Sequence, residues 1–565
     1  MRRKLLLVAL FSLVLAGRAA AQPIQVMPGV TYEHKLTWTP GGPLSMYVIT
    51  APRPGGLYSL TPLLSNNSIT GRETVSSMES RVRRQMTTIG VNGDFFNWLG
   101  GWPSGLLMQG GVMEHHPATN RSAVGIDSSG ELHVDRMPFT AFWQGFSGLT
   151  YPIGQLNEPP RTNSTALFTP AWGASTPPLN ALAAVLAPFP PTVPFRDLTG
   201  TVTSMVSKSA VPIPRNGAVL VARGKYETTL RSEASVGEPL KVRLSLPPDW
   251  PRVTDAVGGG PALVRDGQPI ANSGESLTKI QLQGREPRTA IGQRADGGIV
   301  MVAVDGRRPD WSIGFTNMDL ALALISRGCV TGVALDSGGS TTVALDGNLL
   351  NRPSDPTGER PVAEALVIGY TGVYAAIPAP TLSPNGDGIG DRESFTYKVV
   401  RPSSVTVDLV APGGSTRSLF SGARQPGSYR VTWNGSNPDG SAAPEGKYRF
   451  SVSASDDLGR SSTAGRQFTL DDTLGFVRVG RNARAVSFRL ARAATIRVTV
   501  ETLGGEIMRT VAAGPRSAGT VRVRWNGRDG RHKRLARGTY VVRVAATSSV
   551  GLSELRNVVR IKPVR

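Results

Sequence analysis

The alternation of apolar and polar residues divides this chain into two parts. Beyond about residue 380, short runs alternate between the two, as half-buried strands do; examples are 405–410 and 496–500. Before that point, apolar residues form longer unbroken runs such as 299–304, and residues 317–327 carry apolar side chains at helical spacing. The pattern predicts an α+β domain rich in strand at residues 22–375, followed by all-β structure.

The all-β part contains an internal repeat. Val-Thr-Trp-Asn-Gly begins at residue 431 and Val-Arg-Trp-Asn-Gly at residue 523, an offset of 92 residues, which is the size of one β-sandwich. The repeat predicts two modules, 381–472 and 473–565, after a short proline-containing linker. We interpret Trp433 and Trp525 as core residues, with sugar stacking as the alternative. Both modules resemble the immunoglobulin-like domains of the flagellar hook-capping family.

The first 21 residues have the three parts of a secretory signal peptide. Basic residues at 2–4 precede an apolar run at 5–15, and three alanines at 19–21 offer a cleavage site. A membrane anchor is the alternative, but the run is too short to cross a bilayer of ~30 Å. The sequence therefore predicts a secreted or cell-envelope protein with no transmembrane segment in the mature chain. A single cysteine, Cys329, excludes an intramolecular disulfide framework.

Charge is distributed unevenly. The chain has 62 Lys+Arg and 41 Asp+Glu, a net charge of +21, and residues 476–565 hold 20 of the basic residues but only four acids. Such a surface can attract a polyanion. For an exported protein we expect an anionic envelope polymer and no nucleic acid; colloidal solubility is the alternative interpretation.

Residues 22–375 contain three polar motifs, each of which lies at the start or at the end of an apolar run. The first is Asn-Gly-Asp-Phe-Phe at 92–96, a turn that presents Asp94. The second is Arg-Thr-Ala-Ile-Gly from Arg288, with a second apolar run that ends at Asp305; Arg121 begins a similar stretch. Two such arginines could bind one anion with bidentate geometry, or could pair with carboxylates inside the fold. The third is Leu-Asp-Ser-Gly-Gly-Ser-Thr at 335–341, where backbone amides and hydroxyls can cradle a phosphate.

In this order, and together with Glu-Arg-Pro-Val-Ala at 359–363, these motifs resemble the phosphodiester glycosidase family. The chain departs from the usual family pattern at Asp94 and Ser337, where glycine is common. The resemblance implies hydrolysis of a sugar-1-phosphodiester at its glycosidic bond. The candidate catalytic carboxylates are Asp94, Asp336 and Asp305, with their individual roles open. The candidate substrate- and phosphate-binding residues are Asn92, Arg121, Arg288, Thr289, Ser337, Gly338, Gly339, Ser340, Thr341 and Arg360.

Two other functions compete with this one. A non-catalytic surface protein would bind envelope polysaccharide and use the modules as spacers. A metal-dependent phosphodiesterase would need a dense His/Asp ligand set, and the His115-His116 pair is the only local start of one.

Cofactors and one loop complete the expectations. No cofactor is expected, although calcium is possible at Asn385, Asp387 and Asp391, whose spacing is partly that of an EF-hand loop. A plain turn is the favoured interpretation there. The six prolines between residues 177 and 194 predict a long loop or lid-like insertion.

Overall fold

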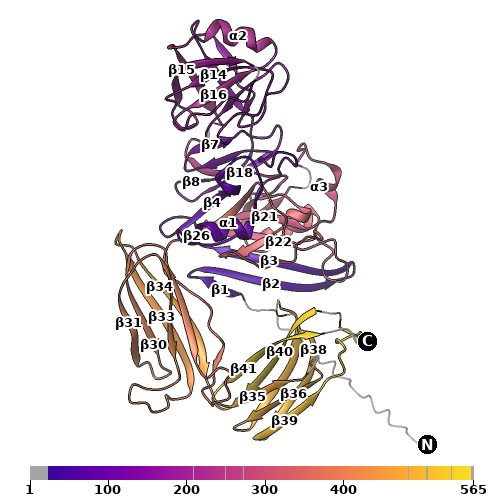
Figure 1. Cartoon of the computed structure of the whole chain (residues 1–565). Coiled ribbons are helices and arrows are strands. Elements are labelled where there is room, and N and C mark those ends of the chain that lie inside the picture. Colours follow the sequence, from indigo (N-terminus) through magenta and orange to yellow (C-terminus); the bar gives the residue numbers. More distant parts are fainter. Residues whose placement is uncertain are drawn as a thin grey trace, which may run out of the picture.

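The computed structural model describes residues 23–561 except 208, 248–249, 271–272, 481–482, 504, 506 and 536–537. The predicted signal peptide lies outside the described residues. The chain forms a strand-rich α+β domain followed by two all-β immunoglobulin-like sandwiches, as the sequence predicts (Figure 1).

An eight-stranded sheet forms the base of the first domain, and all of its neighbouring strands are antiparallel. Its strands, in spatial order, are β1 (Ile24–Met27), β2 (Val30–Thr39), β3 (Gly42–Ala51), β22 (Ile299–Val304), β21 (Arg288–Arg294), β23 (Cys329–Ala334), β19 (Ala262–Arg265) and β20 (Gln268–Pro269). Helix α4 (Asn317–Ile325) packs on this sheet at the position that the helical spacing predicts. The unbroken apolar run of β22 is buried along its whole length, as expected for a strand covered on both faces.

Two five-stranded sheets pack above this base and share one core with it. One contains β7 (Val112–His115), β6 (Leu107–Gln109), β18 (Val253–Gly258), β8 (Ser122–Asp127) and β9 (Leu132–Arg136). The other contains β25 (Asn348–Leu349), β24 (Val343–Leu345), β5 (Thr87–Asn92), β26 (Glu364–Tyr370) and β4 (Tyr58–Leu64), with helix α1 (Val75–Val82) against it.

Residues 140–245 form a further layer that projects from the opposite side to the C-terminal modules (Figure 1). Its sheet consists of β11 (Thr150–Pro152), β10 (Thr140–Gln144), β17 (Pro239–Ser245), β15 (Asp197–Ser207), β14 (Leu182–Leu186), β16 (Ala218–Ala222), β13 (Thr165–Phe168) and β12 (Gln155–Leu156), with helix α2 (Lys225–Glu233) beside it. The prediction of a long loop between residues 177 and 194 is wrong, because β14 occupies the middle of that segment. Its five apolar residues are buried between β15 and β16, and the prolines mark the ends of the strand.

The C-terminal modules are two-sheet sandwiches of related topology. The first pairs β27 (Tyr374–Ala375), β29 (Glu393–Val399) and β32 (Gly427–Trp433) with a sheet of β28 (Thr381–Leu382), β34 (Ser461–Leu470), β33 (Gly446–Asp456), β30 (Ser403–Val410) and β31 (Thr416–Arg424). The second pairs β35 (Leu474–Val479), β36 (Ala485–Leu490) and β39 (Gly519–Arg524) with β38 (Ile507–Arg516), β37 (Ala494–Glu501), β40 (Gly538–Thr547) and β41 (Leu552–Ile561).

Trp433 and Trp525 occupy equivalent places in these two sandwiches. Both are buried, and each indole N–H donates to a backbone oxygen three residues later, at Ser436 and Arg528, over 2.9 Å in both cases. The predicted core role of the repeated tryptophan is therefore confirmed.

Candidate functional site

Asn92 joins the three polar motifs. It is the last residue of β5, and its fully buried amide Nδ2 donates to the backbone oxygen of Asp336 over 2.9 Å. Its Oδ1 accepts hydrogen bonds from Thr289 Oγ1 at 2.8 Å and from the Thr342 amide at 3.2 Å. Because these contacts use both ends of the side-chain amide, Asn92 and Thr289 position the motifs, and we do not place either in contact with substrate.

Three acidic residues gather around this junction. The Asp94 amide donates to Glu364 Oε1 over 2.7 Å, and the Asp336 amide donates to the Gly93 carbonyl oxygen over 3.0 Å. All three carboxyl groups are buried. Burial raises the pKa of Asp94 and raises that of Glu364 well above its usual range; it raises the pKa of Asp336 to about 6, with a further contribution from Asp94. The pKa of Asp336 thus lies just below neutral pH, whereas burial favours the protonated form of Glu364.

Sequence reasoning missed Glu364. It lies at the start of β26, one position after the Glu-Arg-Pro-Val-Ala motif, and every residue of that strand is buried. A lone acid in an otherwise apolar strand was the available signal, because an acidic side chain is almost never fully buried without a partner or a function.

Arg121 is the cation of this cluster. Its guanidinium forms an ion pair with Asp94, donates to the Gly259 carbonyl oxygen and lies 4.5 Å from the centre of the Phe95 ring. The second Asp94 oxygen is enclosed by backbone: a Cβ on Gly105 or on Gly258 would stand 2.6 or 2.2 Å from Oδ2. Glycine at these two positions is what admits the carboxylate.

The Gly-rich motif forms a single 3₁₀ turn, η2 (Gly338–Ser340), beside Asp336. The amides of Gly338 and Thr341 are used inside the fold, at Pro287 O and Gly338 O. The amides of Gly339 and Ser340 are therefore the candidates for the predicted phosphate contact. The Ser337 amide instead donates to Asp336 Oδ1 over 2.7 Å, and Thr341 is buried, with its carbonyl oxygen bonded to Asn351.

Two arginines flank this turn. Arg360 donates to Ser340 Oγ over 3.3 Å and makes a bidentate ion pair with Asp355 at 2.7 and 2.9 Å. A Cβ on Gly339 would overlap that pair, and one on Gly338 would stand 2.9 Å from Arg307, whose side chain is 46% exposed. Arg360 was predicted as a binding residue, whereas Arg307 was missed because nothing in its sequence context separates it from other surface arginines.

An exposed aromatic ring adjoins these arginines. Trp98, two residues beyond the Asn-Gly-Asp-Phe-Phe motif, is 60% exposed. The guanidinium carbons of Arg360 and Arg72 lie 5.0 and 5.6 Å from its ring centre. A large exposed ring held by two cations is a candidate binding surface.

Arg288 lies behind the cluster and has a structural role. It is 2% exposed and donates to the backbone oxygens of Ile280, Gln281, Gly284 and Phe315. The first three follow or belong to α3 (Lys279–Gln283), so the guanidinium caps the C-terminus of that helix. Burial lowers its pKa to about 10. We therefore assign Arg288 this capping role in place of the predicted phosphate contact. The partners of its guanidinium are backbone carbonyl oxygens, and not the carboxylate that the alternative interpretation expected.

Asp305 is likewise a structural residue. Its Oδ2 accepts hydrogen bonds from Tyr47 and from the Trp311 indole, both at 2.8 Å, and its Oδ1 accepts one from Asn351 at 3.0 Å. Burial raises its pKa. Because its oxygens already hold β3, β22 and the 351–352 segment together, we remove Asp305 from the candidate catalytic set.

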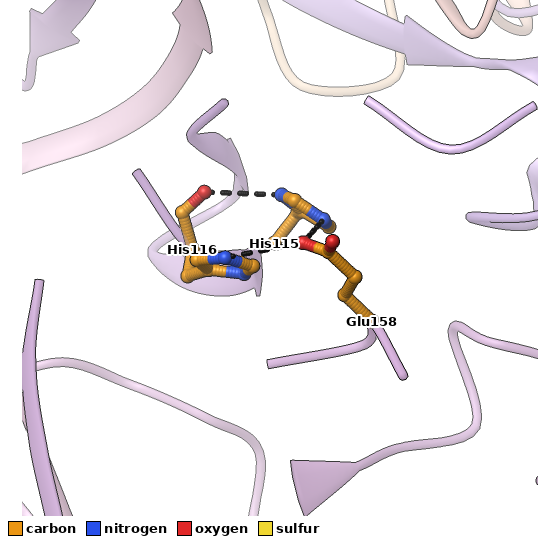
Figure 2. Close-up of side chains that lie close together, drawn as sticks. All are labelled: His115, His116 and Glu158. Atoms are coloured by element: carbon orange, nitrogen blue, oxygen red, sulfur yellow. Dashed lines mark hydrogen bonds and ion pairs between the residues drawn. The ribbon is translucent and has the colours of Figure 1, made fainter. Parts of the chain in front are cut away.

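The His115-His116 pair lies at the end of β7, outside the carboxylate cluster. Glu158 joins it, and one ligand atom from each of the three residues lies within 4.8 Å of the others (Figure 2). Burial lowers the pKa of His115 to about 4 and that of His116 well below its usual value. This group offers three ligands and lacks the dense His/Asp set of the metal-dependent phosphodiesterase hypothesis.

A cleft of about 730 Å³ opens next to these histidines. It lies between the 116–120 segment and the projecting layer, and its charged and polar lining includes His116, Asn120, Arg136 and Arg161. Asn120 immediately precedes Arg121, so one segment of chain contributes to both the cleft and the carboxylate cluster.

The candidate calcium loop is closed by its own amides. Asp391 accepts hydrogen bonds from the amides of Gly386 and Gly388, both at 2.8 Å, and Asp387 Oδ1 accepts one from Ile389 at 2.7 Å. Asn385 Oδ1 accepts one from the Asp387 amide. This is how a plain turn satisfies its carboxylates.

We accordingly expect calcium to leave the protein unchanged. Addition of calcium to EGTA-treated protein should not shift the melting temperature, because the loop supplies only two carboxylates, Asp387 and Asp391, and lacks the bidentate glutamate of an EF-hand. Differential scanning calorimetry is the measurement. A rise in melting temperature that disappears in Asp391→Asn would establish a calcium site instead.

Comparison with known proteins gives separate matches for the first domain and for the C-terminal modules. The family model described as phosphodiester glycosidase matches residues 197–369, and the model described as FlgD Ig-like domain matches 385–457 and 477–549. Residues 197–369 are thus similar to the phosphodiester glycosidase family, and two C-terminal segments are similar to FlgD Ig-like domains. The matched part of the first domain contains Asp336, Arg360 and Glu364; Asp94 and Arg121 lie before it and are brought to it by the contacts described above.

Individual relatives match smaller parts. The curated SPbeta prophage-derived uncharacterized protein YomE of Bacillus subtilis (strain 168) is 40% identical over 108 residues, which are 19% of this chain and 16% of that protein. This chain therefore spans about a sixth of that relative's length. A hypothetical protein from Synechocystis has a similar solved structure, with a TM-score of 0.53 and 25% identity over 62% of this chain and 63% of that one. The catalytic domain of zebrafish N-acetylglucosamine-1-phosphodiester alpha-N-acetylglucosaminidase matches with a TM-score of 0.31 and 14% identity, over 60% and 82%.

Within the described residues, no helix has the length and apolar character needed to cross a membrane.

Proposed function

We propose that this protein is an exported hydrolase that cleaves the glycosidic bond of a sugar-1-phosphodiester. The observation that carries the proposal is the buried Asp336 beside a glycine turn flanked by Arg307 and Arg360. A phosphodiester needs cationic and amide donors at one end, and the sugar carbon needs a carboxylate at the other. The phosphodiester glycosidase domain supports the same reaction class.

In this proposal the glycine turn η2 and the arginines beside it bind the phosphate. In the proposed complex the guanidinium groups of Arg307 and Arg360, with the amides of Gly339 and Ser340, hold the phosphate oxygens. The planar guanidinium suits this task because it can donate two parallel hydrogen bonds to one phosphate. The Trp98 ring beside Arg360 then offers a surface for the apolar face of the sugar or of the second phosphate substituent.

Bond cleavage falls to Asp336. In the proposed step, Asp336 accepts a proton from water as the water oxygen bonds to the sugar C1. The bond from C1 to the phosphate oxygen breaks, and its electron pair leaves with the phosphate, which departs as a monoester. Negative charge on Asp336 also stabilises the oxocarbenium-like charge at C1. A phosphate is already a good leaving group, so this route needs no strong general acid.

The other two acids have supporting roles in this scheme. Glu364, whose pKa lies well above its usual range, stays neutral and accepts the Asp94 amide. Asp94 holds Arg121 next to the cluster. Neutral Glu364 keeps the local charge low enough for Asp336 to ionise near pH 6.

Product analysis tests the proposal. The full chain is incubated with a panel of sugar-1-phosphodiesters, and free sugar and phosphomonoester are measured. Release of both in equal amounts, with ¹⁸O from labelled water in the sugar, is the expected result. Oxygen-18 in the phosphate would mean cleavage of a P–O bond and would contradict it. Saturable glycan binding without products would favour the non-catalytic polysaccharide-binding alternative.

The pH dependence of the reaction follows from the raised pKa of Asp336. Since the ionised form is the active one, kcat/KM should rise with pH through an apparent pKa of about 6 and then level off. Initial rates between pH 4 and 8 measure this. A profile that instead falls with rising pH through 6 would make Asp336 an acid and overturn its assignment as base.

Export and attachment are further parts of the proposal. The N-terminal segment supports secretion or an envelope location, and the basic second module supports contact with an anionic envelope polymer. Cell fractionation tests the first. Retention of the protein on an anionic polymer at increasing salt concentration tests the second. We expect retention to weaken as salt rises and to be absent from a variant in which arginines of residues 473–561 are replaced by acidic residues.

A further inference from the structure

We propose that His115, His116 and Glu158 form a binding site for a divalent transition-metal ion of the zinc class. Two imidazoles and one carboxylate are a ligand set that zinc accepts, with one position left for water. In Figure 2 the two rings and the carboxylate converge on one another.

The hydrogen bonds of His115 direct the lone pair of its Nε2 toward Glu158. His115 Nδ1 lies 2.7 Å from the Gly105 carbonyl oxygen and 3.0 Å from that of His116, so this nitrogen carries the proton and Nε2 does not. His116 Nδ1 lies 3.2 Å from the Leu156 carbonyl oxygen and 3.4 Å from the Leu156 amide, so this ring can adopt either tautomer. A metal ion would select the tautomer with an unprotonated Nε2. Backbone carbonyls that fix the other ring nitrogen are the usual outer contacts of metal-bound histidine.

The Nε2 atoms and the carboxylate lie at nearly suitable separations. Glu158 Oε2 is 3.2 Å from His116 Nε2 and 3.8 Å from His115 Nε2. Bonds of about 2.1 Å at tetrahedral angles place neighbouring ligand atoms about 3.4 Å apart. His115 Nε2 is fully buried and has no hydrogen-bond partner within the described structure. The buried nitrogen and the carboxylate oxygen both present lone pairs, so a positive centre is missing between these two atoms. A metal ion bound to both would supply it.

The local chain holds this arrangement in place. Adjacent residues of a strand point to opposite faces, but β7 ends at His115 and Pro117 follows His116, so the chain turns and the rings stack with centroids 4.5 Å apart. Asn157, which precedes Glu158, is fully buried and binds the Glu114 carbonyl oxygen at 2.8 Å and Thr169 Oγ1 at 2.9 Å. It fastens the projecting layer to the end of β7 and sets Glu158 opposite the histidines.

The position of the site gives the metal a route in and a neighbour. Glu158 is one-third exposed, and His116 lines the 730 Å³ cleft, so an ion can enter from solvent. The Gly105 carbonyl accepts from His115, while a Cβ on the same glycine would stand 2.6 Å from Asp94 Oδ2. A metal at His115 would therefore stiffen the peptide that borders the carboxylate cluster, without itself contacting Asp94.

Zinc binding to the full chain tests the site directly and does not depend on enzymatic activity. The protein is stripped with chelator and given zinc chloride or cobalt(II) chloride. We expect one zinc per chain by elemental analysis after dialysis, a higher melting temperature, and the visible absorption of four-coordinate cobalt. Absence of stoichiometric zinc in the wild-type chain would overturn the proposal.

Three variants localise the ion. Glu158→Gln keeps the size of the side chain and should weaken zinc binding at least about 100-fold, because a neutral amide replaces an anionic ligand; His116→Gln should do the same. The matched control is His133→Gln, since His133 also pairs with a carboxylate, Asp127, at 3.2 Å but has no second histidine beside it. If His116→Gln does not fold, Glu158→Gln decides, because Glu158 is one-third exposed. Wild-type affinity in Glu158→Gln, or equal loss in His133→Gln, would contradict the site.

Discussion

Replacement of Asp336 by asparagine is expected to lower kcat/KM by about three orders of magnitude, the size of effect found when a positioned acid–base group is removed. The amide keeps the shape of the side chain and an oxygen for the Ser337 amide, but it cannot accept the proton of water. Steady-state kinetics on the best substrate of the panel measure the loss.

The same variant should be at least as stable as the wild-type protein at pH 7.5. The folded-state pKa of Asp336 is about 6 and its ordinary value is 3.8, so the folded chain binds this proton more tightly than the unfolded chain. Its contribution to stability is therefore complete below about pH 4 and is lost as the pH rises through 6. Asparagine removes the buried charge. A variant that is both inactive and strongly destabilised would show that the substitution damages the fold, and would leave catalysis by Asp336 unsupported.

Asp305→Asn is the matched control for that experiment. It makes the same chemical change at a carboxylate whose oxygens are bound by Tyr47, Trp311 and Asn351. An amide cannot accept all of these bonds, so the melting temperature should fall while the folded fraction keeps its specific activity. Loss of turnover in a stable Asp305→Asn would restore Asp305 to the catalytic set.

Arg288→Met is expected to lower the free energy of unfolding by about 3–5 kcal/mol, because each buried backbone oxygen left without a donor costs about 1–3 kcal/mol. Methionine fills much of the volume but leaves the oxygens of Ile280, Gln281, Gly284 and Phe315 without their donor. Urea unfolding measures the change, and kcat/KM per folded molecule should remain near that of the wild type.

Arg360→Met separates this structural role from substrate binding. The Arg360 ion pair with Asp355 is partly exposed, so its loss should cost less than about 1 kcal/mol of stability. KM for a phosphodiester should rise instead. If Arg288→Met raised KM and Arg360→Met did not, the two assignments would have to be exchanged.

Sequence patterns predicted the elements of this protein better than the use of its polar atoms. Period-two alternation, the unbroken run of β22 and the spacing of α4 each specify burial directly, and burial determines these elements. The repeated Trp-Asn-Gly likewise carries a packing requirement in its own residues. Strand β14 was not predicted, because prolines at both ends of a short apolar run are equally typical of a loop.

The candidate site shows the opposite limit. Asp94, Asp336 and Arg121 could be selected because their motifs name them, but Arg288 and Asp305 have equally suggestive contexts and are used inside the fold. Arg288 is held inside the fold by carbonyl oxygens of α3 and Phe315. These oxygens lie outside β21, so the sequence of that strand does not indicate whether its arginine faces a ligand. Arg307 and Glu158 become relevant only through neighbours that lie far away along the chain.

The two C-terminal sandwiches have the same fold but differ strongly in net charge. Residues 381–472 contain ten basic and ten acidic residues, whereas residues 476–565 contain 20 and four. Their buried Trp433 and Trp525 have nevertheless kept the same indole hydrogen bond. Since successive residues of a strand face opposite sides, one copy could accumulate arginines on its outer positions while selection on the inner positions continued unchanged. The charged residues on the outer face of one copy could therefore be exchanged for those of the other copy without changes to the buried residues of either core.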